Sequence, residues 1–272
     1  MKTLYVSDLD GTLLRSDQCT SEFTNRTINE LVGKGMLFSY ATARSYVTSV
    51  KVTKGLDARI PLIVYNGAFV IDNANGEILI SNFFAGLEKE ILDGLIGCGV
   101  YPIVYSFIDG VEKFSYIPER CTPGMREFID SRAGDPRDNP VSGVRELYVG
   151  DVFYITCIDD EEKLAPLWER FKPLCRTVFQ RDVYSGEQWL ELMPAGASKS
   201  NAIRQLKEYL GCDRLVVFGD GKNDVDMFQM ADEAYAVENA VDDLKKIASG
   251  VIESNDDDGV AKWLAKNAAT SC

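Results

Sequence analysis

Residues 4–14 read LYVSDLDGTLL, a short apolar run followed by two aspartates and a glycine. Its apolar start predicts a short buried strand that ends at Asp8. Alternation along the backbone places Asp8 and Asp10 on the same side, and Gly11 permits a sharp turn after them. Two such carboxylates suit a hard cation, or a nucleophile beside a general acid. A solvated turn is the alternative. A calcium-binding loop is not indicated, because the sequence has neither a third acidic residue before the glycine nor the distal Glu that such a loop needs.

Three further stretches repeat this arrangement. Residues 36–41, 61–65 and 215–218 are buried-looking strands, and polar residues follow them: Thr42, Asn66-Gly67 and Gly219-Asp220. Helix-length amphipathic segments separate the strands, which predicts an α/β fold with a Rossmann-like parallel sheet and right-handed crossovers. Open sheets of this kind bind ligands at the carboxyl ends of their strands.

The middle of the chain has a different character. Residues 70–80 place two β runs around an Asn/Gly-rich turn, which is typical of a hairpin. Mixed strand and helix patterns follow before the alternation resumes after Met193. We therefore predict a core formed by residues 1–83 and 188–272, with an α+β domain inserted at 84–187.

A second acidic group stands in the sequence GDGKND, residues 219–224. One interpretation is a helix whose N-cap is Asn223, with Asp226 favoured by the helix dipole. That interpretation does not explain Asp220 and Asp224. A functional role for these two carboxylates is the preferred hypothesis.

Lys199 is a cation in the first turn of a predicted helix, beside the expected N-cap Ser198. The positive end of the helix dipole disfavours a cation there. One interpretation is that Lys199 is solvated and that the fold tolerates this small unfavourable interaction. The other is that an anion such as phosphate lies between the helix N-terminus and the ammonium group. Thr42, at another strand end, could donate its hydroxyl to the same anion.

The composition excludes several mechanisms. The chain has 272 residues, 42 Asp+Glu, 29 Lys+Arg and no histidine, with a formal net charge of −13. Imidazole-based catalytic triads and His-ligated zinc are therefore excluded. Such an acidic chain is a poor partner for nucleic acid or an anionic membrane. Seven scattered cysteines without a C-x-x-C pair, no apolar run of about 20 residues and no signal peptide predict a cytoplasmic protein with reduced thiols.

These motifs together resemble those of the haloacid dehalogenase superfamily, and most closely its Cof-type subfamily IIB branch of sugar-phosphatase-like proteins. The resemblance covers the whole chain and identifies four motifs in order: the Asp8–Leu14 segment, Thr42 in Ala41-Thr42-Ala43-Arg44, Lys199, and Gly219–Asp224. Asn66-Gly67-Ala68 matches a patch typical of the branch. Two departures, Ala43 and Ser200 where the family has Gly, bear on substrate scope.

The resemblance implies a Mg²⁺-dependent phosphatase of small phosphorylated metabolites, such as sugar phosphates. Asp8 is then the nucleophile that forms an aspartyl-phosphate, and Asp10 the general acid and base. The implied metal ligands are Asp8, the Asp10 main-chain carbonyl, Asp220 and Asp224, the last directly or through water. The implied phosphate-binding residues are Thr42, Lys199 and Asn223. Arg44 contacts the substrate or braces its loop, and the inserted C2-type cap closes over the site.

Two rival functions stay open. A phosphotransferase or phosphosugar mutase would pass the phosphoryl group to another sugar hydroxyl on the same fold. A non-catalytic sensor of phosphorylated metabolites would bind without reacting, although a sensor needs no nucleophile or acid–base pair. We expect a small metabolite as the partner, no nucleic acid or membrane, and a monomer or weak homodimer.

Overall fold

A computed structural model describes residues 1–181 and 186–268, and the chain divides into two compact units. Unit 1 comprises Met1–Ser81 with Ser198–Cys272, and unit 2 comprises Asn82–Ala197. The second boundary lies at Ser198, whereas the sequence prediction placed it at residue 188. The predicted boundary lies ten residues earlier than the observed one, because the strand Gln188–Met193 pairs within the sheet of unit 2.

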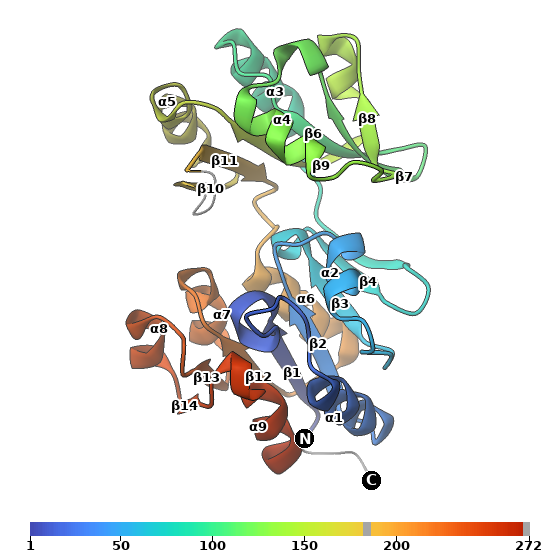
Figure 1. Ribbon diagram of the computed structural model, residues 1–272, viewed down its shortest axis with the longest axis vertical. Helices are drawn as coiled ribbons and strands as arrows, with labels where there is room; N and C mark the ends of the chain where they lie inside the picture. Colours follow the sequence, from blue (N-terminus) through green and yellow to red (C-terminus); the bar gives the residue numbers. More distant parts are fainter. Residues whose placement is uncertain (182–185, 269–272) are drawn as a thin grey trace. The chain divides into compact units, whose positions relative to one another are not determined.

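Unit 1 contains an eight-stranded sheet in the order β14-β13-β12-β1-β2-β3-β4-β5 (Figure 1). The first six strands in this order run parallel to one another. β4 runs antiparallel to both β3 and β5, and β4 and β5 form the hairpin predicted for residues 70–80. The strands are β1 (Thr3–Asp8), β2 (Leu37–Ala41), β3 (Pro61–Val64), β4 (Phe69–Asp72), β5 (Ile78–Ser81), β12 (Arg214–Gly219), β13 (Glu233–Val237) and β14 (Gly250–Ile252).

The α/β class with its parallel sheet is confirmed. Every residue of the central strand β1 is buried, which is why its sequence is a continuous run rather than an alternating one. The helices of unit 1 are α1 (Glu22–Gly33), α2 (Tyr46–Val52), α6 (Lys199–Leu210), α7 (Val225–Met230), α8 (Asp242–Ile247) and α9 (Gly259–Asn267). Helices α1 and α9 pack together on one face of the sheet, and α6 lies on the other (Figure 1).

Serine side chains cap two of the helices of unit 1 that begin near the site, α2 and α6. Ser45 accepts a hydrogen bond from the Thr48 amide at the start of α2, and Ser198 accepts one from the Asn201 amide at the start of α6. Each bond satisfies an amide that has no partner within its helix. The predicted N-cap Ser198 is thereby confirmed, and it fixes Lys199 as the first residue of α6.

Unit 2 has its own sheet, in the order β10-β11-β9-β6-β7-β8. Its strands are β6 (Ile103–Ile108), β7 (Val111–Tyr116), β8 (Asp138–Pro140), β9 (Asp151–Ile158), β10 (Arg176–Arg181) and β11 (Gln188–Met193), and its helices are α3 (Leu87–Gly97), α4 (Pro123–Asp130) and α5 (Glu161–Phe171). A core of its own, with Leu164, Phe171 and Leu190 among its buried members, makes the insertion a separate domain.

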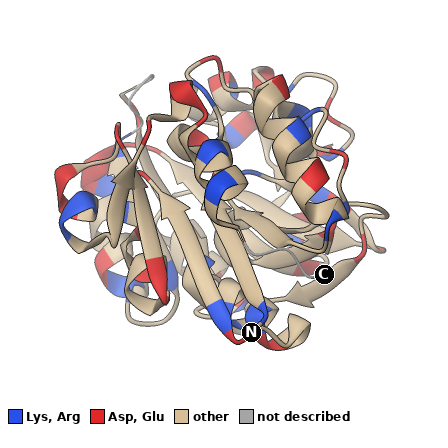
Figure 2. Cartoon of the chain, turned by 90° about the horizontal axis from the view of Figure 1, so that it is seen from below, with Lys and Arg blue, Asp and Glu red and all other residues tan. Residues whose placement is uncertain are grey.

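Most charged residues lie on helices and loops, and few lie on the strands of the sheet in unit 1 (Figure 2). No helix in the described part of the chain combines the length and apolar character needed to cross a bilayer.

We expect Gly67→Ala to destabilise unit 1. Gly67 has φ +92°, and a Cβ there would lie 2.2 Å from the Ser198 carbonyl oxygen. The strain and the clash should lower the free energy of unfolding by about 2–3 kcal/mol in urea denaturation. Gly33→Ala is the matched control, because a Cβ at Gly33 meets nothing within 4 Å and should be neutral or slightly stabilising. Equal effects of the two substitutions would contradict this account of Gly67.

Candidate active site

The carboxyl ends of neighbouring strands bring the predicted residues to one edge of the sheet. β1 lies between β12 and β2, so Asp8, Thr42 and Asp220 come from three adjacent strand ends. Gly11 has φ +78°, which confirms the sharp turn expected after Asp10. A Cβ on Gly11 would lie 2.6 Å from Asp220 Oδ2, so only glycine allows the turn to approach this carboxylate.

A buried ammonium group links two of the carboxylates. Lys199 Nζ donates hydrogen bonds to Asp8 Oδ1 and, at 2.9 Å, to Asp224 Oδ1. Asp8 and Lys199 are each 4% exposed, and Asp224 is fully buried. An unpaired charge at this depth would be strongly unfavourable, so the three groups depend on one another.

Asp224 also organises the loop that carries Asp220. Its Oδ2 accepts hydrogen bonds from the amides of Asp220, at 3.1 Å, and Gly221, at 3.0 Å. Asp224, and not Asn223, is also the residue at the N-cap position of α7. The N-cap prediction for Asn223 was wrong, because Asn223 lies inside the turn Lys222–Asp224. Its side chain is exposed and folds back toward Gly221.

Three carboxylates form a cluster that could hold a metal ion. One oxygen each of Asp8, Asp220 and Asp224 lies within 4.8 Å of the others. Thr12 Oγ1 donates a hydrogen bond of 3.0 Å to Asp220 Oδ1 and so orients that carboxylate. One ammonium group faces three carboxylates, which leaves an excess of negative charge. The donor set therefore fits a hard divalent cation, which prefers carboxylate oxygen.

The pKa values of the cluster reflect this imbalance. Burial raises the pKa of Asp8 well above its usual range; Lys199 lowers it, while Asp224 and Asp220 raise it further. Burial, followed by the charge of Asp224, raises the pKa of Asp220. The pKa of Lys199 is raised because its carboxylate partners outweigh the opposing effect of burial. A cation bound among these groups would lower the pKa values of the carboxylates.

Asp10 does not join the cluster through its side chain. Its carboxylate instead accepts hydrogen bonds from Arg44, whose Nε lies 3.0 Å from both oxygens and whose Nη2 lies 2.6 Å from Oδ1. The hydrogen bonds to Asp10 raise the pKa of Arg44. The Arg44 amide donates to Thr42 Oγ1 at 3.0 Å, so the loop after β2 orients Thr42 as well. Two roles were considered for Arg44, contact with the substrate and bracing of its loop. These contacts are of the bracing kind.

The segment Tyr65–Gly67 ties this loop to α6. The amides of Tyr65 and Asn66 donate 2.9 Å hydrogen bonds to the carbonyls of Arg44 and Thr42. Gly67 packs against the Ser198 carbonyl on the other side. The patch at Asn66-Gly67 thus sets the distance between the Thr42 loop and the first turn of α6.

Two asparagines that the sequence reasoning missed hold the turn after β1. Asn239 Nδ2 donates to the Gly11 carbonyl at 2.8 Å, and Asn255 Nδ2 donates to the Leu14 carbonyl at 2.9 Å. The Asn255 amide donates to Asn239 Oδ1 at 3.1 Å, which joins the two braces. Each asparagine follows the end of a parallel strand, β13 or β14, so the signal that identified Asp8 could have found them.

The two departures from the family pattern cause no visible strain. Ala43 is exposed and is not among the residues with positive φ, so its position does not need glycine. Ser200 Oγ lies 3.1 Å from Ser198 Oγ and extends the polar cap of α6. Neither residue takes part in the contacts of Lys199.

Comparisons with known proteins show the family and the fold. The family model for haloacid dehalogenase-like hydrolases matches residues 5–264. The 5-amino-6-(5-phospho-D-ribitylamino)uracil phosphatase YitU of Bacillus subtilis is 28% identical over 268 residues, covering 96% of each chain. The crystal structure of TM0651 from Thermotoga maritima superposes with a TM-score of 0.80 at 26% identity, covering 100% of this chain and 99% of that one.

A further solved structure shares the fold. The subclass IIB sugar phosphatase BT4131 matches with a TM-score of 0.72 over 98% of both chains, at 20% identity.

We expect Asp220→Asn to stabilise the metal-free protein. The raised pKa of Asp220 means that its ionised form costs folding free energy at neutral pH, and that this cost fades as the pH falls through the folded pKa. Urea denaturation in EDTA at pH 7 should show a gain of about 1 kcal/mol that shrinks toward pH 4. Glu30→Gln, on the exposed surface of α1, is the control and should show no gain. A loss of stability in Asp220→Asn would contradict the proposed charge excess.

Proposed function

The chain belongs to the haloacid dehalogenase-like hydrolase family and is a phosphatase, and we propose that it hydrolyses small phosphorylated metabolites, with Mg²⁺ as cofactor and an aspartyl-phosphate intermediate. The observation that carries this proposal is the buried Asp8 carboxylate, paired with Lys199 at the carboxyl end of β1. The order of the motifs supports the Cof-type branch.

The proposed reaction begins at Asp8. One of its carboxylate oxygens attacks the phosphorus atom, and the bond from phosphorus to the leaving oxygen breaks. Asp10 gives its proton to that oxygen, so the product leaves as a neutral alcohol. Asp10 then takes a proton from water, whose oxygen attacks phosphorus and releases inorganic phosphate together with the free Asp8 carboxylate.

Charge neutralisation accompanies both steps. Lys199 and the Thr42 hydroxyl face the transferring phosphoryl oxygens, and Asn223 helps to position them. Mg²⁺ would be held by the carboxylates of Asp8, Asp220 and Asp224 and by the Asp10 main-chain carbonyl. When bound, it supplies the positive charge that offsets the phosphoryl group.

Arg44 connects substrate binding to Asp10. Its guanidinium group pairs with the Asp10 carboxylate and is a quarter exposed, so an incoming phosphate dianion can compete for it. We propose that this competition frees Asp10 for proton transfer.

The proposed substrates are sugar phosphates or similar phosphomonoesters. YitU and YwtE of Bacillus subtilis are both named 5-amino-6-(5-phospho-D-ribitylamino)uracil phosphatases, which makes that compound a candidate. A panel of hexose and pentose phosphates together with this compound, each assayed with Mg²⁺ and with EDTA, tests the substrate class and the metal together. Activity that EDTA leaves intact would remove Mg²⁺ from the proposal.

Two alternatives share the fold and the binding site. A phosphotransferase or mutase would release a sugar bisphosphate rather than free phosphate, and a sensor would release neither. The acidic net charge supports a protein without nucleic-acid or membrane partners, and we propose a cytoplasmic monomer or weak homodimer.

Asp8→Asn should abolish turnover of p-nitrophenyl phosphate. The amide retains the shape of the side chain but cannot form the acyl-phosphate bond, so kcat should fall by at least about 10⁴-fold. Circular dichroism should show an unchanged fold. Turnover close to wild type in this variant would remove Asp8 from the mechanism.

Arg44→Met should lower kcat/KM by about 10²-fold, because both the phosphate contact and the orientation of Asp10 are lost. Arg26→Met removes an arginine from the surface of α1 and should leave the kinetics unchanged. If Arg44→Met behaves like this control, Arg44 has no part in the reaction.

A further inference from the structure

A cavity of about 400 Å³ lies in unit 1, at the edge of the sheet opposite the active site. Leu37 and Pro61, the first residues of β2 and β3, line it, whereas Thr42 follows the far end of β2. The last turns of α1 and α6 and the strand β5 contribute to its wall. None of the lining residues belongs to the site described above, and the volume is within the range of small-molecule sites.

Aliphatic side chains from four separate elements form much of the wall. They are Val32 from α1, Leu37 from β2, Leu79 from β5 and Leu210 from α6, and each is only partly buried. Tyr209, which is 60% exposed, adds an aromatic ring. Because these side chains are open to water, a ligand with an apolar body can reach them and bury their surface.

Three charged residues line the same cavity, and their charges do not cancel. Arg59 donates hydrogen bonds through Nε and Nη2 to Asp72, and these two charges balance each other. Glu77 is exposed, and in the described part of the chain it has no ion-pair partner. Hydrogen bonding to Asp72 and the charge of Asp72 raise the pKa of Arg59, and the charge of Glu77 raises it further. One guanidinium group thus faces two carboxylates.

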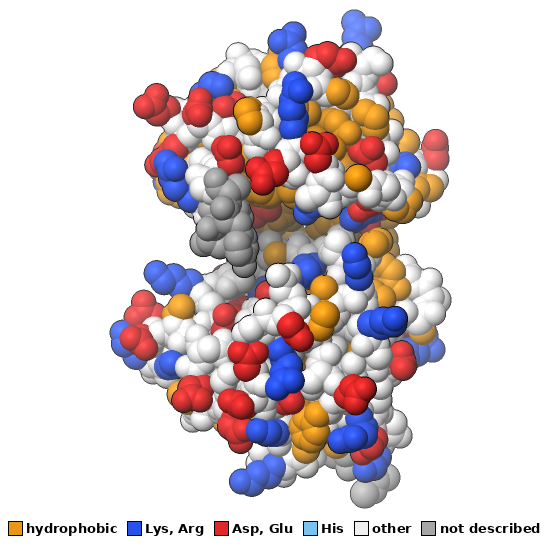
Figure 3. Space-filling model, viewed as in Figure 1, with side chains coloured by type: hydrophobic (Ala, Val, Ile, Leu, Met, Phe, Trp, Pro, Cys, Tyr) orange, Lys and Arg blue, Asp and Glu red, His pale blue; other side chains and the backbone are white. Residues whose placement is uncertain are grey.

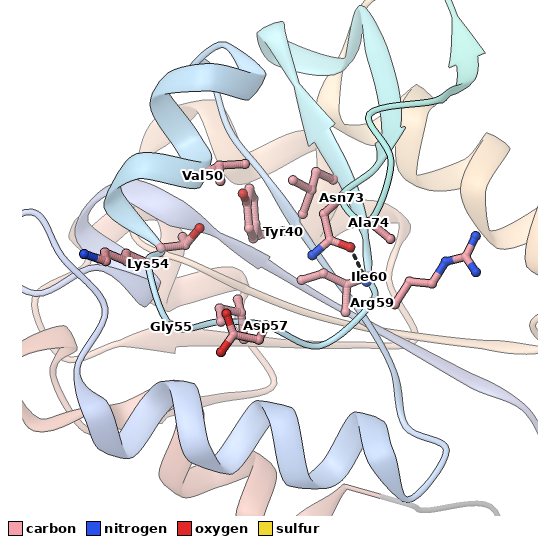
Figure 4. Close-up of a pocket in the computed structure, with 12 residues that line it drawn as sticks. Tyr40, Val50, Lys54, Gly55, Asp57, Arg59, Ile60, Asn73 and Ala74 are labelled. Carbon is pink, nitrogen blue, oxygen red and sulfur yellow. Dashed lines mark hydrogen bonds between the residues drawn. The ribbon is translucent and has the colours of Figure 1, made fainter.

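The segment before β3 directs Arg59 to this cavity. Asn73 Oδ1 accepts a hydrogen bond of 2.8 Å from the Ile60 amide, which holds the segment against β4 (Figure 4). The Arg59 side chain extends from it away from Tyr40 and Val50, which line a separate cavity beside α2 (Figure 4). Arg59 is 72% exposed, so a ligand can approach the charged group.

The excess negative charge selects the sign of the ligand. Lys2 bonds to the Leu210 carbonyl and Lys34 precedes Gly35, but neither lysine lines the cavity. An anion would therefore be repelled by the unbalanced carboxylate, while a cation would be attracted. The net charge of −13 adds to the attraction of a cation.

We propose that this cavity is a second ligand site, which binds a small organic cation. The apolar body of the ligand packs against the aliphatic wall and Tyr209, and its ammonium group pairs with Glu77. Phenethylamine, which is protonated at neutral pH, is the probe of this chemistry. Phenethyl alcohol is its neutral counterpart, and hydrocinnamate is its anionic counterpart.

The test titrates the ¹⁵N-labelled full chain with each probe and follows the backbone amides by NMR. Phenethylamine should shift the amides of residues 35–38, 59–60 and 77–79 to saturation, phenethyl alcohol should bind more weakly, and hydrocinnamate should bind most weakly. Glu77→Gln should weaken phenethylamine about two- to fivefold, the range of one exposed ion pair, and should leave phenethyl alcohol unchanged.

The matched control is Asp57→Asn. Asp57 is an exposed carboxylate of the same connecting segment, but it lines the cavity beside α2 and not this one, so phenethylamine should bind this variant like the wild type. A second variant tests the apolar wall: Leu79→Trp should fill the cavity and weaken phenethylamine and phenethyl alcohol by at least about tenfold, because the body of each probe loses its place.

The proposal is overturned if phenethylamine shifts none of these amides or shifts them without saturation. Hydrocinnamate that binds as tightly as phenethylamine would also overturn it, because the sign of the charge would then be wrong. Equal binding of phenethylamine to Glu77→Gln and Asp57→Asn would remove Glu77 from the site, and wild-type binding by Leu79→Trp would place the probe elsewhere.

Discussion

A single buried ammonium group connects parts of the chain that are almost two hundred positions apart in sequence. Lys199 donates to Asp8, at the end of β1, and to Asp224, after β12, and no other described cation reaches these two carboxylates. Because a buried charge is tolerated only when it is paired, this contact constrains the first turn of α6 and both strand ends at once. The Tyr65–Gly67 segment, which packs on Ser198, extends the constraint to the loop of Thr42 and Arg44.

The same contact leaves the site short of positive charge. Asp220 adds a third carboxylate. Burial and the charge of Asp224 raise its pKa, so the ionised form of Asp220 is disfavoured in the folded chain. An excess of negative charge of this kind favours binding of a divalent cation. The proposed Mg²⁺ would bring positive charge to the place on an acidic protein where an anionic substrate has to bind. The net charge of −13 disfavours long-range attraction of polyanions. The local field at the edge of the sheet depends instead on Lys199, Arg44 and the proposed ion. Figure 3 shows acidic and basic side chains interspersed over the visible surface.

The sequence predicted the parallel core, the hairpin and, to within about one residue, the carboxyl ends of β1, β2, β3 and β12, because these follow from apolar runs and from the polar residues after them. It placed Asp8, Asp220 and Asp224 at one edge of the sheet, since adjacent parallel strands share that edge. It was wrong in having the Asp10 carboxylate converge with Asp8, because Asp10 pairs with Arg44 instead. It could not predict that Asp224 would replace Asn223 as the cap of its turn, or that β11 would belong to the inserted unit. Both outcomes depend on tertiary contacts, those of Asp224 with Lys199 and of β11 with β9 and β10. No local pattern separated the two roles considered for Arg44, contact with the substrate and bracing of its loop, and none indicated its pairing with Asp10.

Capture of the phosphorylated enzyme tests the central claim most directly. Wild-type protein mixed with a slowly hydrolysed phosphomonoester and quenched in acid within the first turnover should carry one phosphoryl group, and peptide mass analysis should place it on Asp8. Treatment with hydroxylamine should release it, as expected of an acyl phosphate. A phosphoryl group on another residue, or turnover without any covalent phosphate on the protein, would contradict the assignment of Asp8 as the nucleophile.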